Sequence, residues 1–520
     1  MGNSRKQSAT IAILFGINTC VGYAFIIGIS SFYNSVGNWF LFFLPLCGLI
    51  SFVVGICFSK LTLQIEGYGG SYLYVKKAFG RYAATITGFF QYAQVPAICI
   101  GIISGILWSF KAINEDFYVD NKNWLVLGAF ILFVIFSSIL FFGLKMTKYT
   151  VLILWILKWA VLLFSLVISL TLISKFGQNF SDTSQLDPSN KTYKPFHSLG
   201  ISDVISSIIL FFFAFGGFEN LAAISHDVKN PSKVMPKIIA GLILFATVFY
   251  LIYFVCMVGA LGSGNHDYTI NSEGNANIIN NLINKVFKDH FKLAGGVVTG
   301  IIITAVLSQM ANKLSGRVQS AWVNTRLISP LAFDGIIPHH FAKRDKHGQF
   351  RNALYLDFVI SFIAVLAYCV LLYFSIPYKD NDPNNQHTPS YADYLDRTLQ
   401  VYTLTAFTQY ILTLLAAVKL AKKKEIILNK FWKITFLIMA GFLLFLTFFF
   451  LIDSIRILIV NSDSLNILAF CFYCFVFAAA NFFYFYSKKA NWKDKAKAEI
   501  TEEEFLDTEV KLEHKVVEIE

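Results

Sequence analysis

The stretch Phe211-Phe212-Phe213-Ala214-Phe215-Gly216-Gly217-Phe218-Glu219-Asn220 decides the fold of this chain. Its first half is apolar enough to lie in a bilayer, yet a Gly-Gly pair and an acid interrupt it. Lipid offers no partner to the backbone N–H and C=O groups that such a break frees, so the break must line a cavity within protein. Broken membrane helices typically mark the binding site of a transporter. A glycine-kinked helix in another kind of membrane protein is the alternative.

The composition is that of an integral membrane protein, because 56% of the 520 residues are hydrophobic and only 14% are charged. Apolar stretches long enough to cross ~30 Å of hydrocarbon recur along the chain. They cover residues 9–33, 38–59, 82–109, 124–144, 149–174, 199–224, 236–262, 294–323, 352–376, 399–420, 432–453 and 464–487. We therefore predict an all-α protein with twelve transmembrane helices. The first stretch is too long for a cleavable signal peptide.

The formal net charge of +11 does not indicate a nucleic-acid partner. When alternate loops are assigned to the two sides of the membrane, most of the 43 Lys and Arg residues fall on the side that holds both termini. Cytoplasmic loops carry such an excess, so both termini are expected in the cytoplasm. High use of Asn, Lys, Ile and Phe is typical of an AT-rich bacterial genome, which favours the plasma membrane.

Residues 9–174 and 199–420 each contain five predicted spans. An odd number of crossings inverts the second unit relative to the first, which predicts a five-plus-five inverted repeat with discontinuous helices one and six. Both helices are interrupted in the sequence, the first at Asn18 to Gly22 and the sixth at Gly216-Gly217. The other parts are a cytoplasmic N-tail (1–8), two extra helices (432–487) and a cytoplasmic C-terminal tail (488–520).

The sixth span, which continues into Lys229-Asn230-Pro231, closely resembles that of the amino acid–polyamine–organocation (APC) superfamily of permeases. Gly69 to Tyr74 with Ala78-Phe79-Gly80 resembles the superfamily's entrance to the third span. Thr325-Arg326 with Asp334 to Pro338 resembles its exit from the eighth span. The resemblance covers about residues 10–420 and implies an amino acid permease that works by alternating access.

The first-span motif departs from the family pattern, because Gly-x-Gly becomes Gly22-Tyr23-Ala24. Half-helix ends suit a zwitterion, since free N–H groups receive its carboxylate and free C=O groups its ammonium. We expect the carboxylate at the N–H groups of Val21, Gly22, Tyr23 and Ala24. We expect the ammonium at the carbonyls of Gly16, Ile17 and residues 213–216. Gly216 and Gly217 permit close approach of the substrate.

Phe213 and Phe215 flank the break in the sixth span. The resemblance implies that they close over the substrate as an aromatic gate, and a packing or lipid-facing role is the alternative. Glu219 is the one acid deep within a span, where a charge must be paired or protonated. It is expected to bond a polar neighbour or a helix end and so to support the broken segment.

Lys158 lies within the fifth span, where an unpaired ammonium costs about 2.5–3.5 kcal/mol. Burial favours the neutral amine, which suits a group that binds and releases a proton. In some APC permeases a fifth-span lysine touches first-span carbonyls at the position where sodium-coupled relatives hold Na⁺. The resemblance therefore implies proton coupling, or a fixed charge in a sodium-independent exchanger. A static strut paired with carbonyls is the alternative.

The eighth span carries a polar face that includes Ser308, Asn312 and Ser315. We interpret this face as a wall of the ion or proton site. Lys313 and Arg317 lie on the adjacent face and are interpreted as snorkelling to the cytoplasm. No His, Cys or carboxylate cluster indicates a metal, and no cofactor is expected.

The sequence thus predicts a secondary active transporter for amino acids, either a proton-coupled symporter or a sodium-independent exchanger. Neutral or mixed substrates are favoured over strictly cationic ones, because no acid is clearly aimed into the pocket. Two alternatives remain open, a transporter-like amino acid sensor and a membrane-embedded enzyme. The enzyme would need a nucleophile, a histidine or a metal constellation near one membrane interface.

Overall fold

The computed structural model describes residues 8–22, 25, 36–65, 67–111, 115–177, 200–261, 278–345, 349–375, 391–461, 464–490 and 492. Every regular element in these residues is a helix. The elements are α1 (Ala9–Cys20), η1 (Gly37–Trp39), α3 (Phe40–Gln64), α4 (Ser71–Phe79), α5 (Arg81–Lys111), α6 (Glu115–Ser138), η2 (Ile139–Phe142), α7 (Leu144–Phe176), α8 (Ile201–Phe212), η3 (Phe213–Phe215), α9 (Phe218–Ala223), η4 (Ser225–Asp227), α10 (Pro231–Leu261), α11 (Ile278–Ile283), η5 (Asn284–His290), α12 (Gly295–Phe333), η6 (His339–Ala342), α13 (Arg351–Ser375), α14 (Tyr391–Lys422), α15 (Lys430–Asn461) and α16 (Ser464–Ala490).

Ten helices in the described residues are long and apolar enough to cross a membrane. They match predicted spans two to five and seven to twelve, which confirms the all-helical, multi-pass expectation. The other two predicted spans, 9–33 and 199–224, contain only the 12-residue helices α1 and α8 before the chain leaves helical geometry. The count of twelve crossings therefore stays a prediction.

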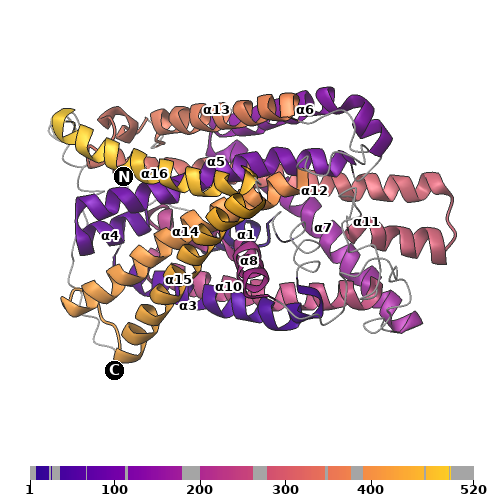
Figure 1. Ribbon diagram of the computed structural model, residues 1–520, viewed down its shortest axis with the longest axis horizontal. Coiled ribbons are helices and arrows are strands. Elements are labelled where there is room, and N and C mark those ends of the chain that lie inside the picture. Colours follow the sequence, from indigo (N-terminus) through magenta and orange to yellow (C-terminus); the bar gives the residue numbers. More distant parts are fainter. Residues whose placement is uncertain are drawn as a thin grey trace.

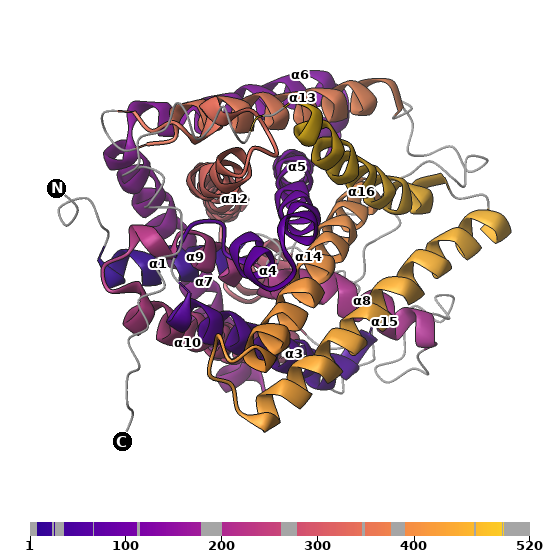
Figure 2. The same cartoon turned by 90° about the vertical axis from the view of Figure 1, so that its left-hand side faces the viewer.

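The short, interrupted helices lie at the centre of the molecule. Figure 2 shows α4 and α9 in the middle, with α3, α5, α10, α12 and α14 around them and α1 beside α9. In the same view α6 and α13 run along one side, and α15 and α16 lie at the periphery. Figure 1 likewise shows α1 and α8 between the long helices. The breaks in the chain are therefore enclosed by protein, as their freed backbone groups require.

The outer helices expose apolar side chains, which is the pattern expected of surfaces in contact with lipid. On α7, Ile153 and Val167 are exposed, whereas Lys158 on the same helix is buried. A surface helix of a water-soluble protein shows the opposite pattern, with its polar side chains facing outward and its apolar side chains facing inward. This arrangement places the chemistry of α7 toward the centre of the molecule.

A buried ion pair joins four of the surrounding helices. The Arg317 guanidinium of α12 contacts the Asp357 carboxylate of α13 at 3.1 Å, and the two side chains are 1% and 0% exposed. Asn324 and Tyr92 donate to the other carboxylate oxygen at 2.7 and 3.0 Å, and Arg317 Nε donates to Ser137 at 2.9 Å. The network ties α5, α6, α12 and α13 together.

The interpretation that Lys313 and Arg317 snorkel to the cytoplasm is wrong, because both are buried among helices. The predicted span ended at residue 323, whereas α12 has 39 residues and continues to Phe333. Its last turns are too polar to read as a membrane span, but neighbouring helices bury them. Both cations therefore lie much farther from the helix end than the hydropathy pattern suggested.

Asp357→Leu is expected to destabilise the protein by about 3–5 kcal/mol, because it leaves the Arg317 guanidinium buried without its counter-charge. The unfolding midpoint of detergent-solubilised protein, followed by tryptophan fluorescence, measures this loss. The double variant Arg317→Met/Asp357→Leu should recover most of it, since removing both charges is often nearly neutral. A single variant as stable as the unmodified protein would contradict this assignment.

Candidate functional site

The sixth predicted span is interrupted where the Gly-Gly pair stands. Helix α8 ends at Phe212, the single turn η3 follows, and the chain becomes extended at Gly216, with ψ of 161°. Gly217 has φ of 108°, a left-handed conformation that glycine adopts without steric cost, and α9 begins at Phe218. Helix α1 ends at Cys20, and Val21 and Gly22 follow in non-helical geometry.

The two breaks touch each other. A Cβ atom added to Gly217 would lie 2.9 Å from Thr19 Cβ, in the last turn of α1. Real Cβ atoms essentially never come so close, so a glycine is required here for both its conformation and its size. The Thr19 hydroxyl in turn lies 2.9 Å from the carbonyl of Gly16, to which it can donate. The end of α1 and the start of α9 thus form one junction.

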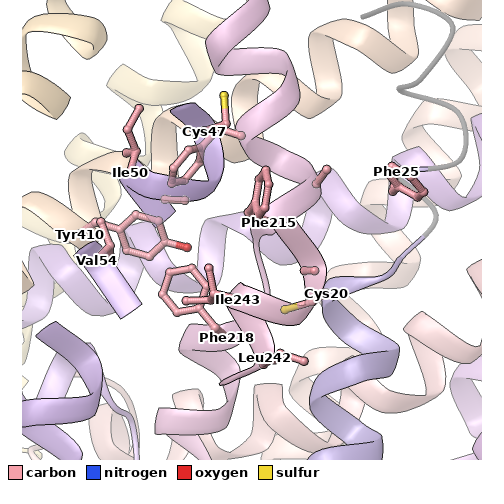
Figure 3. Packing of buried hydrophobic residues seen from close by; sticks show 14 of the residues in the cluster. Cys20, Phe25, Cys47, Ile50, Val54, Phe215, Phe218, Leu242, Ile243 and Tyr410 are labelled. Carbon is pink, nitrogen blue, oxygen red and sulfur yellow. The ribbon is translucent and has the colours of Figure 1, made fainter. Parts of the chain in front are cut away.

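Glu219 holds the start of α9. Its two carboxylate oxygens lie 3.1 and 2.9 Å from the Gly217 N–H, which the break has freed from any helical partner. Tyr402 and Tyr410 of α14 donate to the same carboxylate at 3.1 and 2.9 Å. Figure 3 shows Tyr410 beside Phe218, with Phe215 and Cys20 close by. The acid therefore links the broken segment to α14.

Tyr250 of α10 bridges the carbonyls of the two breaks. Its hydroxyl is within hydrogen-bond distance of Cys20 O in α1 and lies 2.8 Å from Ala214 O in η3. A phenol carries one proton, so it donates fully to only one of these carbonyls at a time. The phenol O–H can therefore switch its hydrogen bond from the carbonyl at one break to the carbonyl at the other.

Lys158 lies against the end of α1. Its ammonium is 2.8 Å from Val21 O, 2.7 Å from Asn18 Oδ1 and 3.3 Å from Asn18 O. A lysine ammonium has three donors, so these three acceptors match the charged form. Two of the three are backbone carbonyls at the end of the helix, where the negative end of the helix dipole favours a cation.

Asn18 extends this contact to α12 and was not assigned a site role from the sequence. Its amide nitrogen donates to Ser315 Oγ at 2.9 Å and to Gln319 Oε1 at 2.6 Å. Gln319 donates to Phe15 O in α1 at 2.7 Å, and Ser308 donates to Leu157 O in α7 at 3.0 Å. The polar face of α12 therefore packs on both α1 and α7. The signal that could have identified Asn18 is a polar residue within an otherwise apolar segment.

A cavity of about 120 Å³ lies beside the junction of the two breaks. Residues of α1, α5, η3, α9, α12 and α14 and of the segments next to them line it. They are Asn18, Thr19, Cys20, Gly22, Ala97, Ile98, Gly101, Ile102, Phe213, Gly216, Gly217, Asn220, Asn312, Lys313, Gly316, Ser320, Thr398, Leu399 and Tyr402. The volume is several times the ~10–15 Å³ that a cavity needs on this measure to hold one water, which leaves room for a small solute.

The structure brings some of the expected substrate residues to this cavity and leaves others away from it. The expected substrate residues in the lining are Gly22, Phe213, Gly216 and Gly217, and Asn312 of the predicted polar face lines it as well. Gly16, Ile17, Val21 and Phe215 are not among the lining residues, and Tyr23 and Ala24 lie outside the described residues. Phe213 and Phe215 separate because two positions in a 3₁₀ turn point in different directions. Phe213 packs edge-on against Tyr402 at 4.5 Å, whereas Phe215 packs against Tyr250 at 5.3 Å.

The donors expected to receive a carboxylate are partly occupied in this conformation. The Val21 N–H bonds Ile17 O at 3.0 Å, and the Gly22 N–H bonds Cys20 O at 2.7 Å. An N–H group has one proton, whereas a carbonyl has two lone pairs. The carbonyls at the breaks therefore keep capacity to accept from a ligand, while these two N–H groups do not.

The remaining sequence motifs meet beyond the cavity. Asp227 of η4 pairs with Arg326 of α12 at 2.8 Å and accepts from Tyr68 at 2.7 Å. Asp334 accepts from Tyr72 at 2.5 Å and from Lys76 at 2.6 Å. Burial raises the pKa of the Tyr68 phenol, and the negative charge of Asp227 raises it further. The phenol therefore stays protonated and remains a donor at neutral pH. These contacts join η4 and the end of α12 to α4 and to the turn before it.

A family model described as amino acid permease matches residues 8–493, nearly the whole chain. The chain belongs to the amino acid permease family, within the APC superfamily. This permease is accordingly a multi-pass membrane transporter and not an enzyme.

Curated relatives extend the comparison. An uncharacterised protein of Mycoplasma genitalium is 28% identical over 440 residues, which cover 82% of this permease and 83% of that protein. The branched-chain amino acid permease BcaP of Bacillus subtilis is 23% identical over 49% of this chain and 55% of its own. The vacuolar cationic amino acid transporter 4 of Arabidopsis thaliana is 22% identical over 65% of this chain and 54% of its own.

Gly217→Ala is expected to separate the two breaks. The left-handed conformation costs a non-glycine residue about 1–3 kcal/mol, and the contact with Thr19 adds overpacking of about 1–3 kcal/mol. Since about 1.4 kcal/mol corresponds to tenfold, the initial rate of amino acid uptake into proteoliposomes should fall at least tenfold. Gly241→Ala on α10, where nothing lies within 4 Å of an added Cβ, is the control and should transport normally. Normal uptake by Gly217→Ala would contradict the requirement for glycine.

Proposed function

We propose that this permease is a secondary active transporter that moves amino acids across the plasma membrane by alternating access. In this proposal the chain crosses the membrane twelve times as a five-plus-five inverted repeat followed by two extra helices. Both termini are cytoplasmic. The first repeat is residues 9–174 and the second is residues 199–420, so the broken helices are the first of each repeat.

The observation that carries the proposal is the junction of the two breaks beside the cavity. The ends of α1 and α9 meet at Thr19 and Gly217, and both residues line the cavity. Broken helices supply backbone acceptors and donors where a membrane helix would otherwise have none to offer. A zwitterion needs both, and the family places an amino acid in this role.

We assign the substrate ammonium to the free acceptor capacity of the carbonyls at the breaks, near Gly16, Ile17 and residues 213–216. The carboxylate is assigned to the N–H groups that follow α1. Because Val21 and Gly22 are engaged within the chain, this assignment depends on Tyr23 and Ala24, or on opening of the turn at Cys20. Phe213, which lines the cavity, is proposed as the aromatic gate, and Phe215 as its buried support.

Alternating access requires that one group of helices move against another. The network around Arg317 and Asp357 joins α5, α6, α12 and α13 into a scaffold. The moving group is then the broken helices with α3 and α10, which pack on them. Asn18 lies at the boundary between the two groups, because it belongs to α1 and bonds Ser315 and Gln319 of α12.

Lys158 is proposed to couple this movement to a proton. In its charged form the ammonium has a donor for each of its three acceptors at the end of α1. Loss of the proton and its charge would weaken the attachment of α7 to Asn18 and Val21, which frees α1 to move. The alternative within the same site is a permanent charge, which stabilises α1 in a sodium-independent exchanger without taking part in proton transfer.

Lys158→Met is expected to remove the stimulation of uptake by an inward proton gradient, because the variant keeps the side-chain length but has no titratable group. The measurement is radiolabelled amino acid uptake into proteoliposomes with and without the gradient. Lys175→Met is the matched control, since Lys175 lies on the same helix and is exposed. The variant should fall to the gradient-free rate, and the control should keep its full response.

Other outcomes of this experiment have equally definite meanings. Uptake by the unmodified protein only into vesicles preloaded with amino acid would identify an exchanger and remove the proton from the mechanism. Full stimulation in Lys158→Met would contradict coupling through this lysine. Amino acid binding without any flux would contradict the transporter assignment and indicate a sensor.

A further inference from the structure

Asn312 of α12 is a polar side chain of the cavity wall that the transport mechanism above does not use. It lines the cavity and is 3% exposed. Two other members of the polar face of α12 are outside the lining, because Ser308 donates to α7 and Ser315 accepts from α1. The face therefore divides, and Asn312 is the part of it that meets the cavity.

Asn312 offers a hydrogen-bond donor that the protein itself does not use. Its amide nitrogen is buried and has no partner among the residues that the structure describes. A buried donor in this state has lost its hydration without compensation, and such groups are rare in folded proteins. An acceptor on a ligand in the cavity would supply the missing hydrogen bond.

Several other polar groups of the lining are already engaged within the protein. Four side chains donate to protein acceptors, and they are Asn18, Thr19, Ser320 and Tyr402. Lys313 donates to the carbonyl of Gly105 and to Ser109 Oγ, neither of which lines the cavity. The Asn312 amide differs from these groups, because its donor is directed at the cavity and is not taken by the protein.

Asn312 also stands away from the break in α1. The Asn18 side chain contacts α12 at Ser315 and Gln319, which lie roughly 4.5 and 10.5 Å farther along the helix axis at 1.5 Å per residue. The part of the lining that α5 contributes is small or apolar and consists of Ala97, Ile98, Gly101 and Ile102. With its ammonium and carboxylate held at the breaks, a substrate extends its side chain toward α5 and α12.

The chemistry of this wall selects among side chains. A hydrocarbon side chain would leave the Asn312 donor buried beside it without a partner. An ammonium would find no carboxylate among the described residues of the lining, and one neutral amide does not replace the hydration of a second carboxylate. A hydroxyl or a carboxamide both donates and accepts, as the Asn312 amide itself does, so either of these groups can pair with it.

We propose that this permease selects neutral amino acids whose side chain carries a hydroxyl or a carboxamide, and that Asn312 recognises that group. The inference rests on the proposed transport function and names the substrate class of the same cavity. It narrows the neutral or mixed preference expected from the sequence. Asn312 becomes a specificity residue instead of part of an ion or proton site, and the breaks hold the part common to all amino acids.

The test measures radiolabelled uptake of two matched pairs of substrates by the full chain in proteoliposomes. L-threonine and L-valine differ in a hydroxyl against a methyl group, and L-asparagine and L-leucine differ in a carboxamide against an isopropyl group. The KM should be at least tenfold lower for threonine than for valine and for asparagine than for leucine, because the hydrocarbon member leaves the buried donor unpaired. A preference in one pair alone supports the proposal and identifies the group that Asn312 recognises. No preference for the polar member in either pair would overturn it.

Asn312→Leu keeps the size of the side chain and removes the amide. It should raise the KM of the polar member of each pair at least tenfold and leave the KM of the hydrocarbon member unchanged or lower. Thr304→Val is the matched control, because Thr304 is exposed on the same helix and donates to Gly300 O within it. It should change none of the four KM values.

The stability of Asn312→Leu separates recognition from a structural role. Because the lost donor has no partner in the described protein, its removal should not lower the unfolding midpoint of the detergent-solubilised protein. A variant that fails to fold would overturn the assignment of Asn312, while the matched pairs in the unmodified protein would still test the substrate class. Equal loss of uptake of both members of a pair would assign Asn312 to the part that all amino acids share, and would also overturn its role in selection.

The failure of the inference is distinguishable from the failure of the proposed function. If the unmodified protein carries valine or leucine as well as it carries threonine or asparagine, the substrate class is wrong but the transporter assignment stands. If it carries no amino acid at all, the transport function itself is refuted.

Discussion

Backbone groups released where two helices break must find partners inside the protein, and this requirement organises the centre of the molecule. Each unsatisfied group in an apolar environment costs several kcal/mol. Four side chains of three chemical kinds meet the requirement here. Thr19 and Tyr250 supply hydroxyls, Lys158 supplies an ammonium, and Glu219 supplies a carboxylate. The candidate binding site is therefore also a structural junction, and a change in any of these groups alters both.

The requirement also determines what remains for a ligand. The Val21 and Gly22 N–H groups already donate to backbone carbonyls, and the Gly217 N–H already donates to the Glu219 carboxylate. The carbonyls at the breaks still have unused lone pairs. In this conformation the junction favours a cation over an anion, so further donors must come from side chains. Asn312 of α12 is one such side chain, because it lines the cavity and its amide nitrogen has no partner within the described residues.

Features that depend on neighbouring residues could be predicted from the sequence, and features that depend on distant partners could not. The Gly216-Gly217 break follows from local backbone chemistry, and the long apolar runs of the outer helices follow from composition. The contacts of Asn18 with Ser315 and Gln319 join residues 297 and 301 positions apart, and no local pattern reveals them. The burial of Lys313 was missed for a related reason. Packing by other helices, and not hydropathy, determines where α12 ends.

The ion pairs differ in the free energy that is needed to separate them, and this difference suggests which helices move together. The Arg317–Asp357 pair is almost wholly buried, and separating such a pair costs about 3–5 kcal/mol. The Lys76–Asp334 pair beyond the cavity has its lysine 41% exposed, and pairs of that kind contribute about 0–1 kcal/mol. Water can hydrate the Lys76 ammonium and the Asp334 carboxylate when this pair separates. The Arg326–Asp227 pair at the same end is more buried, with side chains 5% and 14% exposed, so opening there is inexpensive only where it leaves that pair in place. A transport cycle that separates Lys76 from Asp334 but keeps both buried pairs therefore costs less than one that divides the scaffold.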